Sequence, residues 1–254
     1  MKLSICTTNY NCAHAIERHL VSIYHSLAGL DFEYIVVDNH SQDESRRLFE
    51  EWARSHPNMS VLVRRCTMGS GRQIAFEHSS GRTVMVVDTD VVYNELFRRF
   101  VDAYFANYSH LSLQAVYCGL FPREQWLAAG GRRSLNTNED VDLWVRIARL
   151  GSMRWYPIPL GDNLKDPDAW GRADHLSSRY TKSGRMIRLL RREWDLFKTR
   201  DIESIDLDAL IRPQTIDLEL GPKPGRWPQN RSRRSGVQHL LQFAREFKQT
   251  LELG

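Results

Sequence analysis

Short apolar runs alternate with amphipathic stretches along the first part of the chain. Four runs are short and rich in β-branched residues, as buried strands are: 3–8, 33–38, 60–65 and 83–88. Apolar residues at helical spacing separate these runs, and we expect helices near 16–27, 41–52 and 73–78. Because helices alternate with strands that are continuously apolar, the pattern predicts a mostly parallel sheet sandwiched by helices, an α/β fold.

The alternation continues to about residue 160 and then stops. We expect a helix near 94–106, a strand near 112–118, a helix from about Asn138 to Gly151, and an extended segment after it. Beyond this point the sequence is polar and basic: a loop over 161–180, a basic helix over 183–200, a Pro/Gly/Arg linker over 221–236, and a final helix. The chain therefore divides into an α/β domain over 1–160 and a basic helical extension over 161–254.

Composition narrows the class of protein. The chain has 254 residues, 42% hydrophobic and 26% charged, with a net charge of +4, which excludes a disordered chain, a collagen-like repeat and a small cysteine-rich module. Its four cysteines form no CxxC pair and no zinc-like spacing, as expected for reduced thiols. No apolar run approaches the roughly 20 residues that span a bilayer, and the first residues lack a signal-peptide core. We expect a cytoplasmic protein, either free or peripheral on the cytoplasmic face of the membrane.

Polar side chains stand where three of the predicted strands end, at Thr8, Asp38 and Asp88. In a parallel sheet, ligands bind outside these carboxyl ends. Asp88 is followed by Thr89 and Asp90, and residues two apart in an extended chain point the same way. Two neighbouring carboxylates repel unless a cation neutralises them, so the pair is a candidate site for Mg²⁺ or Mn²⁺. The alternative is a solvated turn, which Asp also favours.

Four segments together resemble a family 2 glycosyltransferase of the GT-A fold. They occur in the order of that family: SICTTNYNCA, YIVVDNHSQDES, GSGRQIAFEHSSGRTVMVVDTDV with its DxD motif, and NEDVDLWVRIARLG. The resemblance covers about residues 3–151 and implies a transferase that uses a nucleotide-diphospho-sugar. It divides the first domain into a nucleotide-sugar half over 1–92 and an acceptor half over 93–160.

The resemblance also implies roles for residues of the donor half. Thr8 and Tyr10 match positions that line the nucleotide base pocket, and Asp38 matches an acid that hydrogen-bonds the base. Asn39 stands where the family often has a second Asp, so either residue is a candidate for the base contact. Arg72 falls where a basic residue approaches the nucleotide.

The metal and the catalytic base follow from the same resemblance. Asp90 is expected to be a direct metal ligand, with Asp88 near the ribose and the metal, and His175 is a further candidate ligand. Asp140 matches the base that takes a proton from an acceptor hydroxyl in an inverting transfer. A lipid phosphate acceptor is already anionic and would need no such base.

Ordinary structural roles are the alternatives for the acidic segment. Acids in the first turn of a helix favour its macrodipole, which would account for Asp140. Asp142 and Arg146 are four residues apart, so a helix-surface ion pair would account for both. Ser41 and Glu44 have the spacing of a capping box, which we expect to begin the second helix.

The basic segment over 179–200 has two interpretations. It is either an interfacial helix on an anionic membrane, useful for a lipid-linked acceptor, or a helix packed on the core with a solvated basic rim. No motif supports nucleic-acid binding.

The sequence thus predicts a metal-dependent glycosyltransferase that acts on a glycan or a lipid-linked acceptor. Two alternatives stay open. One is a catalytically degenerate domain that serves as a binding or scaffold module. The other is a sugar-nucleotide nucleotidyltransferase, since GSGR at 69–72 is similar to the glycine-rich loop of those enzymes, although theirs follows the first strand.

Overall fold

The computed structural model describes residues 3–136, 139–164 and 194. His175, the basic segment over 179–200 and the linker over 221–236 lie outside the described residues, apart from Trp194. Within the described part of the chain, no helix is both long and apolar enough to cross a membrane.

The described chain alternates strands and helices. The strands are β1 (Leu3–Asn9), β2 (Phe32–Asp38), β3 (Met59–Val63), β4 (Thr83–Val87), β5 (Val91–Tyr93), β6 (Ser112–Val116), β7 (Cys118–Pro122), β8 (Met153–Pro159) and β9 (Gly161–Asn163). The α-helices are α1 (Ala13–Ser26), α2 (Ser45–Ser55), α3 (Met68–Glu77), α4 (Glu95–Ala103), α5 (Arg123–Ala128) and α6 (Glu139–Arg149). A π-helical turn, Tyr104–Tyr108, continues α4.

Seven strands form one sheet in the order β3-β2-β1-β4-β7-β6-β8. The first four are parallel to one another, β7 runs antiparallel to both β4 and β6, and β8 is parallel to β6. The predicted α/β fold with a mostly parallel sheet is confirmed. The strands β2 and β3 lie on one side of β1, and β4 lies on the other. The order of strands in the sheet therefore reverses between β1 and β4, and sheets of this kind bind ligands at such a point.

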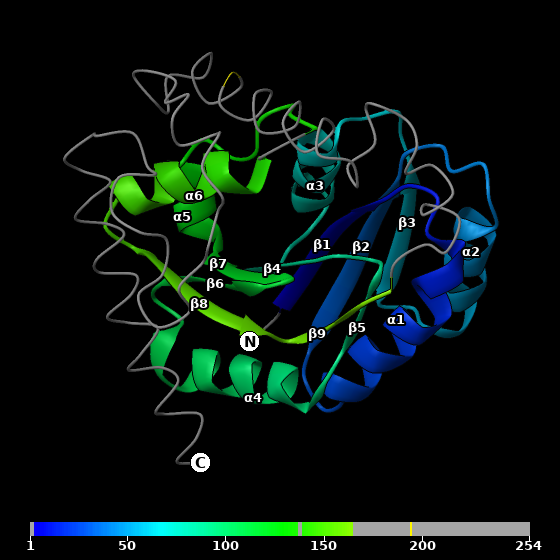
Figure 1. Cartoon of the computed structure of the whole chain (residues 1–254), viewed down its shortest axis with the longest axis horizontal. Helices are drawn as coiled ribbons and strands as arrows, with labels where there is room; N and C mark the ends of the chain where they lie inside the picture. The colour runs from blue at the N-terminus through cyan, green and yellow to red at the C-terminus, as the bar shows by residue number, and fades with distance from the viewer. Residues whose placement is uncertain (1–2, 137–138, 165–193, 195–254) are drawn as a thin grey trace, which may run out of the picture.

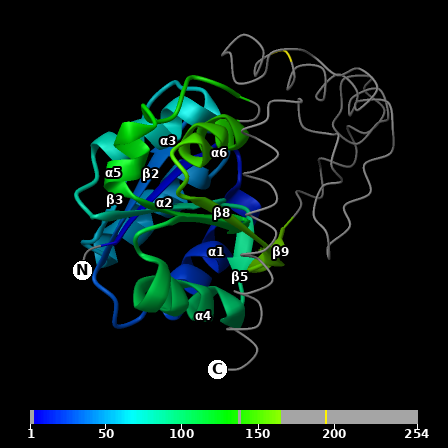
Figure 2. The ribbon, with the colours of Figure 1, turned by 90° about the vertical axis from the view of Figure 1, so that its left-hand side faces the viewer.

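Helices cover both faces of this sheet (Figures 1 and 2). Residues of α1, α2 and α4 join one apolar cluster, which holds Met85 and Val87 of β4. Residues of α3, α5 and α6 join the other, which holds Val84 and Val86. Successive residues of a strand point to opposite faces, so a strand with helices on both sides must be apolar at every position. Burial on both faces therefore explains why Val84 to Val87 of β4 are all apolar.

The structure departs from the sequence prediction in several places, and it adds the short elements α5 and β5. The capping box does not form: the Ser41 hydroxyl donates to Asp38 Oδ2 (2.6 Å), and α2 begins at Ser45, after Glu44. The expected strand over 112–118 is two strands, β6 and the start of β7, which meet at Tyr117 with φ 69°. The first residues of the expected loop form β9, which pairs antiparallel with β5.

Candidate active site

A set of polar residues lies where β1 and β4 separate. The two strands pair only as far as Ile5 and Met85. Beyond that point the Thr7 hydroxyl donates to the Val87 carbonyl oxygen (2.7 Å) in place of a backbone hydrogen bond. Asp88 follows β4 directly, so it stands at the carboxyl edge of the sheet next to the end of β1.

Asn9, which the sequence motifs did not single out, connects the ends of three strands. Its Oδ1 accepts from the Thr89 hydroxyl (3.1 Å), and its Nδ2 donates to Asp38 Oδ2 (2.9 Å). Asp38 Oδ1 accepts from the Ser41 amide (2.9 Å), and the Asp38 side chain has no solvent exposure. Asp38 therefore fixes the turn after β2 in this structure.

The other residues predicted for the base pocket differ in whether their side chains already form hydrogen bonds within the protein. Thr8 donates its hydroxyl to the Val37 carbonyl oxygen (3.1 Å), and Asn39 Oδ1 accepts from the Cys66 amide (3.0 Å). Tyr10 is 54% exposed. Of these three side chains, Tyr10 offers the largest free surface to a planar ligand.

Two glycines allow close approaches to α3, at Gly71 from the end of β1 and at Gly69 from the segment before α6. Thr67 caps the helix by accepting from the Ser70 amide (3.1 Å). A Cβ on Gly71 would lie 2.5 Å from Thr8 Oγ1, and one on Gly69 would clash with the Arg133 carbonyl oxygen. The GSGR segment is thus the first turn of α3, where the glycines permit close packing and Arg72 enters the site.

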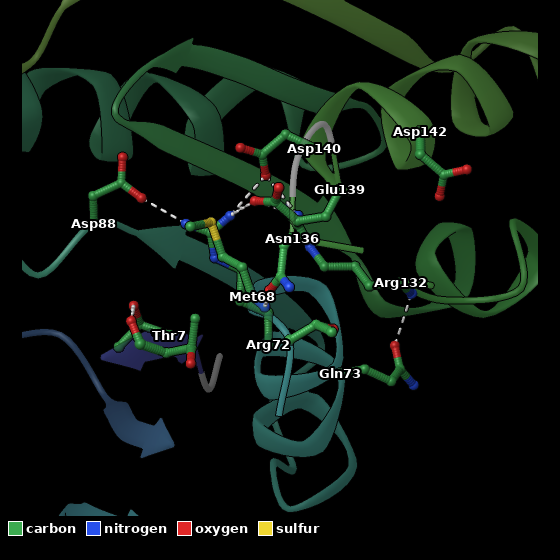
Figure 3. Close-up of polar contacts among 12 residues, drawn as sticks. Thr7, Met68, Arg72, Gln73, Asp88, Arg132, Asn136, Glu139, Asp140 and Asp142 are labelled. Carbon is green, nitrogen blue, oxygen red and sulfur yellow. Dashed lines mark hydrogen bonds and ion pairs between the residues drawn. The ribbon is translucent and has the colours of Figure 1, made fainter. Parts of the chain in front are cut away.

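Arg72 contacts carboxylates from two segments that lie far apart in the sequence (Figure 3). Its Nη2 lies 2.6 Å from Asp88 Oδ1, and its Nη1 lies 2.9 Å from Asp140 Oδ1 and also pairs with Glu139. The Arg72 side chain is 4% exposed. Burial opposes its charge, but the three carboxylates raise the pKa of Arg72 above its ordinary value. A single buried guanidinium thus connects the DxD segment with the start of α6.

Arg132 is a second buried guanidinium, and no sequence motif marks it. Its Nη1 lies 2.6 Å from Asp140 Oδ1 and 3.7 Å from Glu139 Oε1. Its side chain has no exposure and packs over the Trp126 ring, 5.3 Å from the centroid. Both arginines therefore approach the same oxygen of Asp140.

The three carboxylates of the cluster differ in proton affinity. Burial, with Asp140 and Asp90 nearby, raises the pKa of Asp88 to about 6 against the opposing effect of Arg72. Burial and Asp140 raise the pKa of Glu139 to about 7. Burial acts in the same direction on Asp140, but Arg72 and Arg132 outweigh it and hold its pKa at about 2. Asp140 is thus ionised at neutral pH.

The same region matches a known family. The family model described as glycosyl transferase family 2 matches residues 4–157. The chain belongs to this family. No curated protein sequence matches the chain.

Solved structures of similar fold include several sugar-transferring enzymes. A Pyrobaculum calidifontis mannosyltransferase in complex with GDP-Man and Mn²⁺ has TM-score 0.54 and 20% identity, over 72% of this chain and 64% of that one. S. aureus TarS has TM-score 0.56 and 16% identity, over 97% of this chain and 53% of that one. The Mycobacterium tuberculosis glucosyl-3-phosphoglycerate synthase, in complex with Mn²⁺, UDP and its product, has TM-score 0.55 and 17% identity, over 81% of each chain. This chain therefore spans less than two thirds of the length of the first two proteins. At these sequence identities, the likeness establishes the fold alone.

The DxD segment of this family 2 chain offers oxygen ligands to a divalent ion. Among the residues that the structure describes, no three His, Cys, Asp or Glu side chains gather into a metal site. Asp88 and Asp90 are close enough for the charge of Asp90 to raise the pKa of Asp88. Two carboxylates fit Mg²⁺ or Mn²⁺ when substrate phosphates and water supply the other ligands. His175 lies outside the described residues.

The ion pair of Asp142 and Arg146 in this family 2 segment is buried, which the spacing of the two residues did not reveal. Asp142 and Arg146 do form the expected i, i+4 ion pair. Asp142 is completely buried, however, so the expected surface pair is wrong in its location. Arg133 also contacts Asp142 (2.9 Å), and Arg146 donates to the Ala129 carbonyl oxygen. These contacts tie the segment that carries Arg132 to α6.

Proposed function

We propose that this chain is a metal-dependent glycosyltransferase that moves a sugar from a nucleotide-diphospho-sugar to an acceptor hydroxyl, with inversion at the anomeric carbon. A lipid phosphate is the alternative acceptor. The observation that carries the proposal is Arg72, which contacts Asp88 on the donor side and Asp140 on the acceptor side. Membership of glycosyl transferase family 2 and the sugar-transferring enzymes among similar structures support it.

The donor nucleotide would lie over the carboxyl ends of β1 and β2. The exposed ring of Tyr10 is suited to stack on the base. Thr8 and Asn39 would line the pocket, and Asp38 would serve it by holding the turn after β2. This placement leaves the diphosphate directed toward Asp88, because Asp88 stands at the neighbouring strand end.

The diphosphate end of the donor would meet Asp88 and Asp90, which would hold Mg²⁺ or Mn²⁺. When bound, the ion neutralises the diphosphate as it leaves the sugar. Arg72 lies beside Asp88 and supplies fixed positive charge at the same place. Its contacts with three carboxylates keep it oriented before the donor arrives.

Asp140 would accept the proton of the acceptor hydroxyl. Both arginine contacts in the described structure fall on its Oδ1, and its side chain is 36% exposed, so Oδ2 is the oxygen available to an acceptor. With a pKa of about 2, the carboxylate is always ready to accept but is a weak base, so proton transfer would be late in the reaction. An acceptor phosphate would dispense with this step.

The test is hydrolysis of a panel of UDP-, GDP- and dTDP-sugars with Mn²⁺, in which water takes the place of the acceptor and nucleoside diphosphate is released, for wild type and Asp140→Asn. We expect a loss of roughly 10²–10⁴-fold in kcat for the variant with little change in KM. Asp102→Asn, an exposed acid on α4, is the matched control and should behave as wild type. Binding without release for every donor would instead favour a scaffold module, and full activity of Asp140→Asn would remove its role as base.

A further inference from the structure

Arg132 is held in place from its backbone outward. Its amide donates to Gln73 Oε1 (2.8 Å), which also accepts from Trp126 Nε1 (3.0 Å). Gly131 before it has φ 70°, and a Cβ there would lie 2.6 Å from Gln73 Oε1, so only glycine suits this approach. The position of the guanidinium beside α6 is thus set by α3 and α5.

The surroundings of this guanidinium are poor for stability. Its side chain has no exposure, and none of its three guanidinium nitrogens forms a hydrogen bond with a described residue, so its contact with Asp140 (Nη1–Oδ1, 2.6 Å) is an ion pair. An apolar side chain of similar size would pack against Trp126 without leaving buried donors unpaired. The residue type is therefore better explained by its effect on its partner, Asp140, than by packing.

Charges reach Asp140 from every neighbouring element. Arg72 approaches from α3, Arg132 from the segment after α5, Asp88 from the end of β4, and Glu139 from the preceding position of α6. Two guanidinium groups thus face three carboxylates. Arg132 contacts Glu139 and Asp140 at the start of α6, whereas Arg72 divides its contacts between these two acids and Asp88.

We propose that Arg132 is a positioning residue, which fixes Oδ1 of Asp140 and keeps this carboxylate charged so that Oδ2 can take the acceptor's proton. The inference rests on the proposed role of Asp140. Without Arg132, one guanidinium would face three acids, and Glu139 and Asp140 would retain a proton between them at neutral pH. Catalysis would then depend on losing that proton first.

Arg132→Met tests this through the pH dependence of nucleoside diphosphate release from the sugar nucleotide that wild type uses. We expect Arg132→Met to show an acidic limb in kcat with a midpoint at about pH 7, which lowers kcat about tenfold at pH 6. Activity should return toward that of wild type at pH 8.5, and KM should not change, because Arg132 contacts no residue assigned to the donor. Arg132→Lys should restore most of the profile, since it retains the charge.

Arg46→Met is the control, since it removes an exposed arginine that forms an ion pair with Glu50 on α2, away from the cluster. It should leave the profile unchanged. Thermal melting checks that Arg132→Met still folds cooperatively. A loss of kcat that is equal at all pH values, or an unchanged profile, would overturn the inference.

Carboxyl-carbon NMR between pH 3 and 9 gives a readout that does not need turnover, with the Asp140 signal assigned by its loss in Asp140→Asn. The signal should not titrate in wild type and should titrate in Arg132→Met. If Asp140→Asn is inactive but both readouts of Arg132→Met match wild type, the inference about Arg132 fails while the proposed role of Asp140 stands. If Asp140→Asn is fully active while the NMR shift occurs, Arg132 sets the charge of Asp140, and the role of Asp140 as base fails.

Discussion

Replacing Arg72 by methionine removes the guanidinium that contacts all three carboxylates of the cluster. Removing one partner of a buried ion pair typically costs about 3–5 kcal/mol. Asp88 and Asp140 are 38% and 36% exposed, so water screens them, and Glu139, at 4%, carries most of the cost. We therefore expect a loss of about 3 kcal/mol at pH 8, where Glu139 is ionised, at the lower end of that range.

The loss should shrink in acid. The pKa of Glu139 is about 7, so at pH 5 it carries a proton and no longer needs the guanidinium. The expected loss there is about half as large, about 1–2 kcal/mol. Urea unfolding followed by tryptophan fluorescence at pH 5 and pH 8 measures both values.

A surface arginine provides the matched control for this comparison. Arg46→Met breaks an ion pair with Glu50 on α2, whose side chains are 56% and 40% exposed, and should leave the free energy of unfolding unchanged at either pH. A small and equal loss for Arg72→Met at both pH values would refute the reasoning, because it would mean that Glu139 is solvated.

Three further predictions concern stability and donor binding. Burial raises the pKa of Glu139 from 4.5 to about 7, so the folded state binds this proton more tightly than the unfolded state. The free energy of unfolding should therefore fall by up to about 3 kcal/mol as pH rises from about 4.5 to 7. Urea midpoints that stay constant over this range would contradict this prediction. Gly71→Ala places a Cβ 2.5 Å from Thr8 Oγ1, so it should lower the free energy of unfolding by about 1–3 kcal/mol and weaken nucleotide binding. An unchanged melting temperature would show that α3 does not need this close approach. Tyr10→Ala should leave the melting temperature unchanged, because the ring is 54% exposed, but should weaken calorimetric nucleotide binding by about tenfold, in the range of base stacking; equal affinity would exclude the stacking role.

Much of the sheet could be predicted because its central strands are buried on both faces. The run at 83–88 is apolar from Val84 to Val87, and the structure makes it β4, between helices on either side. The strands β5 and β9 have three residues each, too few for a periodic pattern. The strand β7 contains Gly119 and ends at Pro122, and neither residue is typical of a strand.

The site was predictable only where local motifs mark it. Asp88, Arg72 and Asp140 stand in recognisable segments, and the structure brings them together. Arg132 follows a glycine pair that is also compatible with an ordinary turn, and its partners come from α3, α5 and α6, which only the folded chain brings together. The spacing of Asp142 and Arg146 predicted their ion pair, but burial depends on the segment packed over it.

The central claim is that Asp88 and Asp90 form a divalent-metal site that holds the diphosphate of a nucleotide sugar. Calorimetric binding of UDP, GDP and dTDP, each with and without Mn²⁺, to wild type and to Asp90→Asn tests it most directly, with Asp102→Asn as the control. We expect one nucleotide to bind wild type and the control tightly only with Mn²⁺, and Asp90→Asn to lose that dependence together with most of the affinity. Binding that is indifferent to Mn²⁺ and to Asp90, or no binding of any of the three, would contradict the claim.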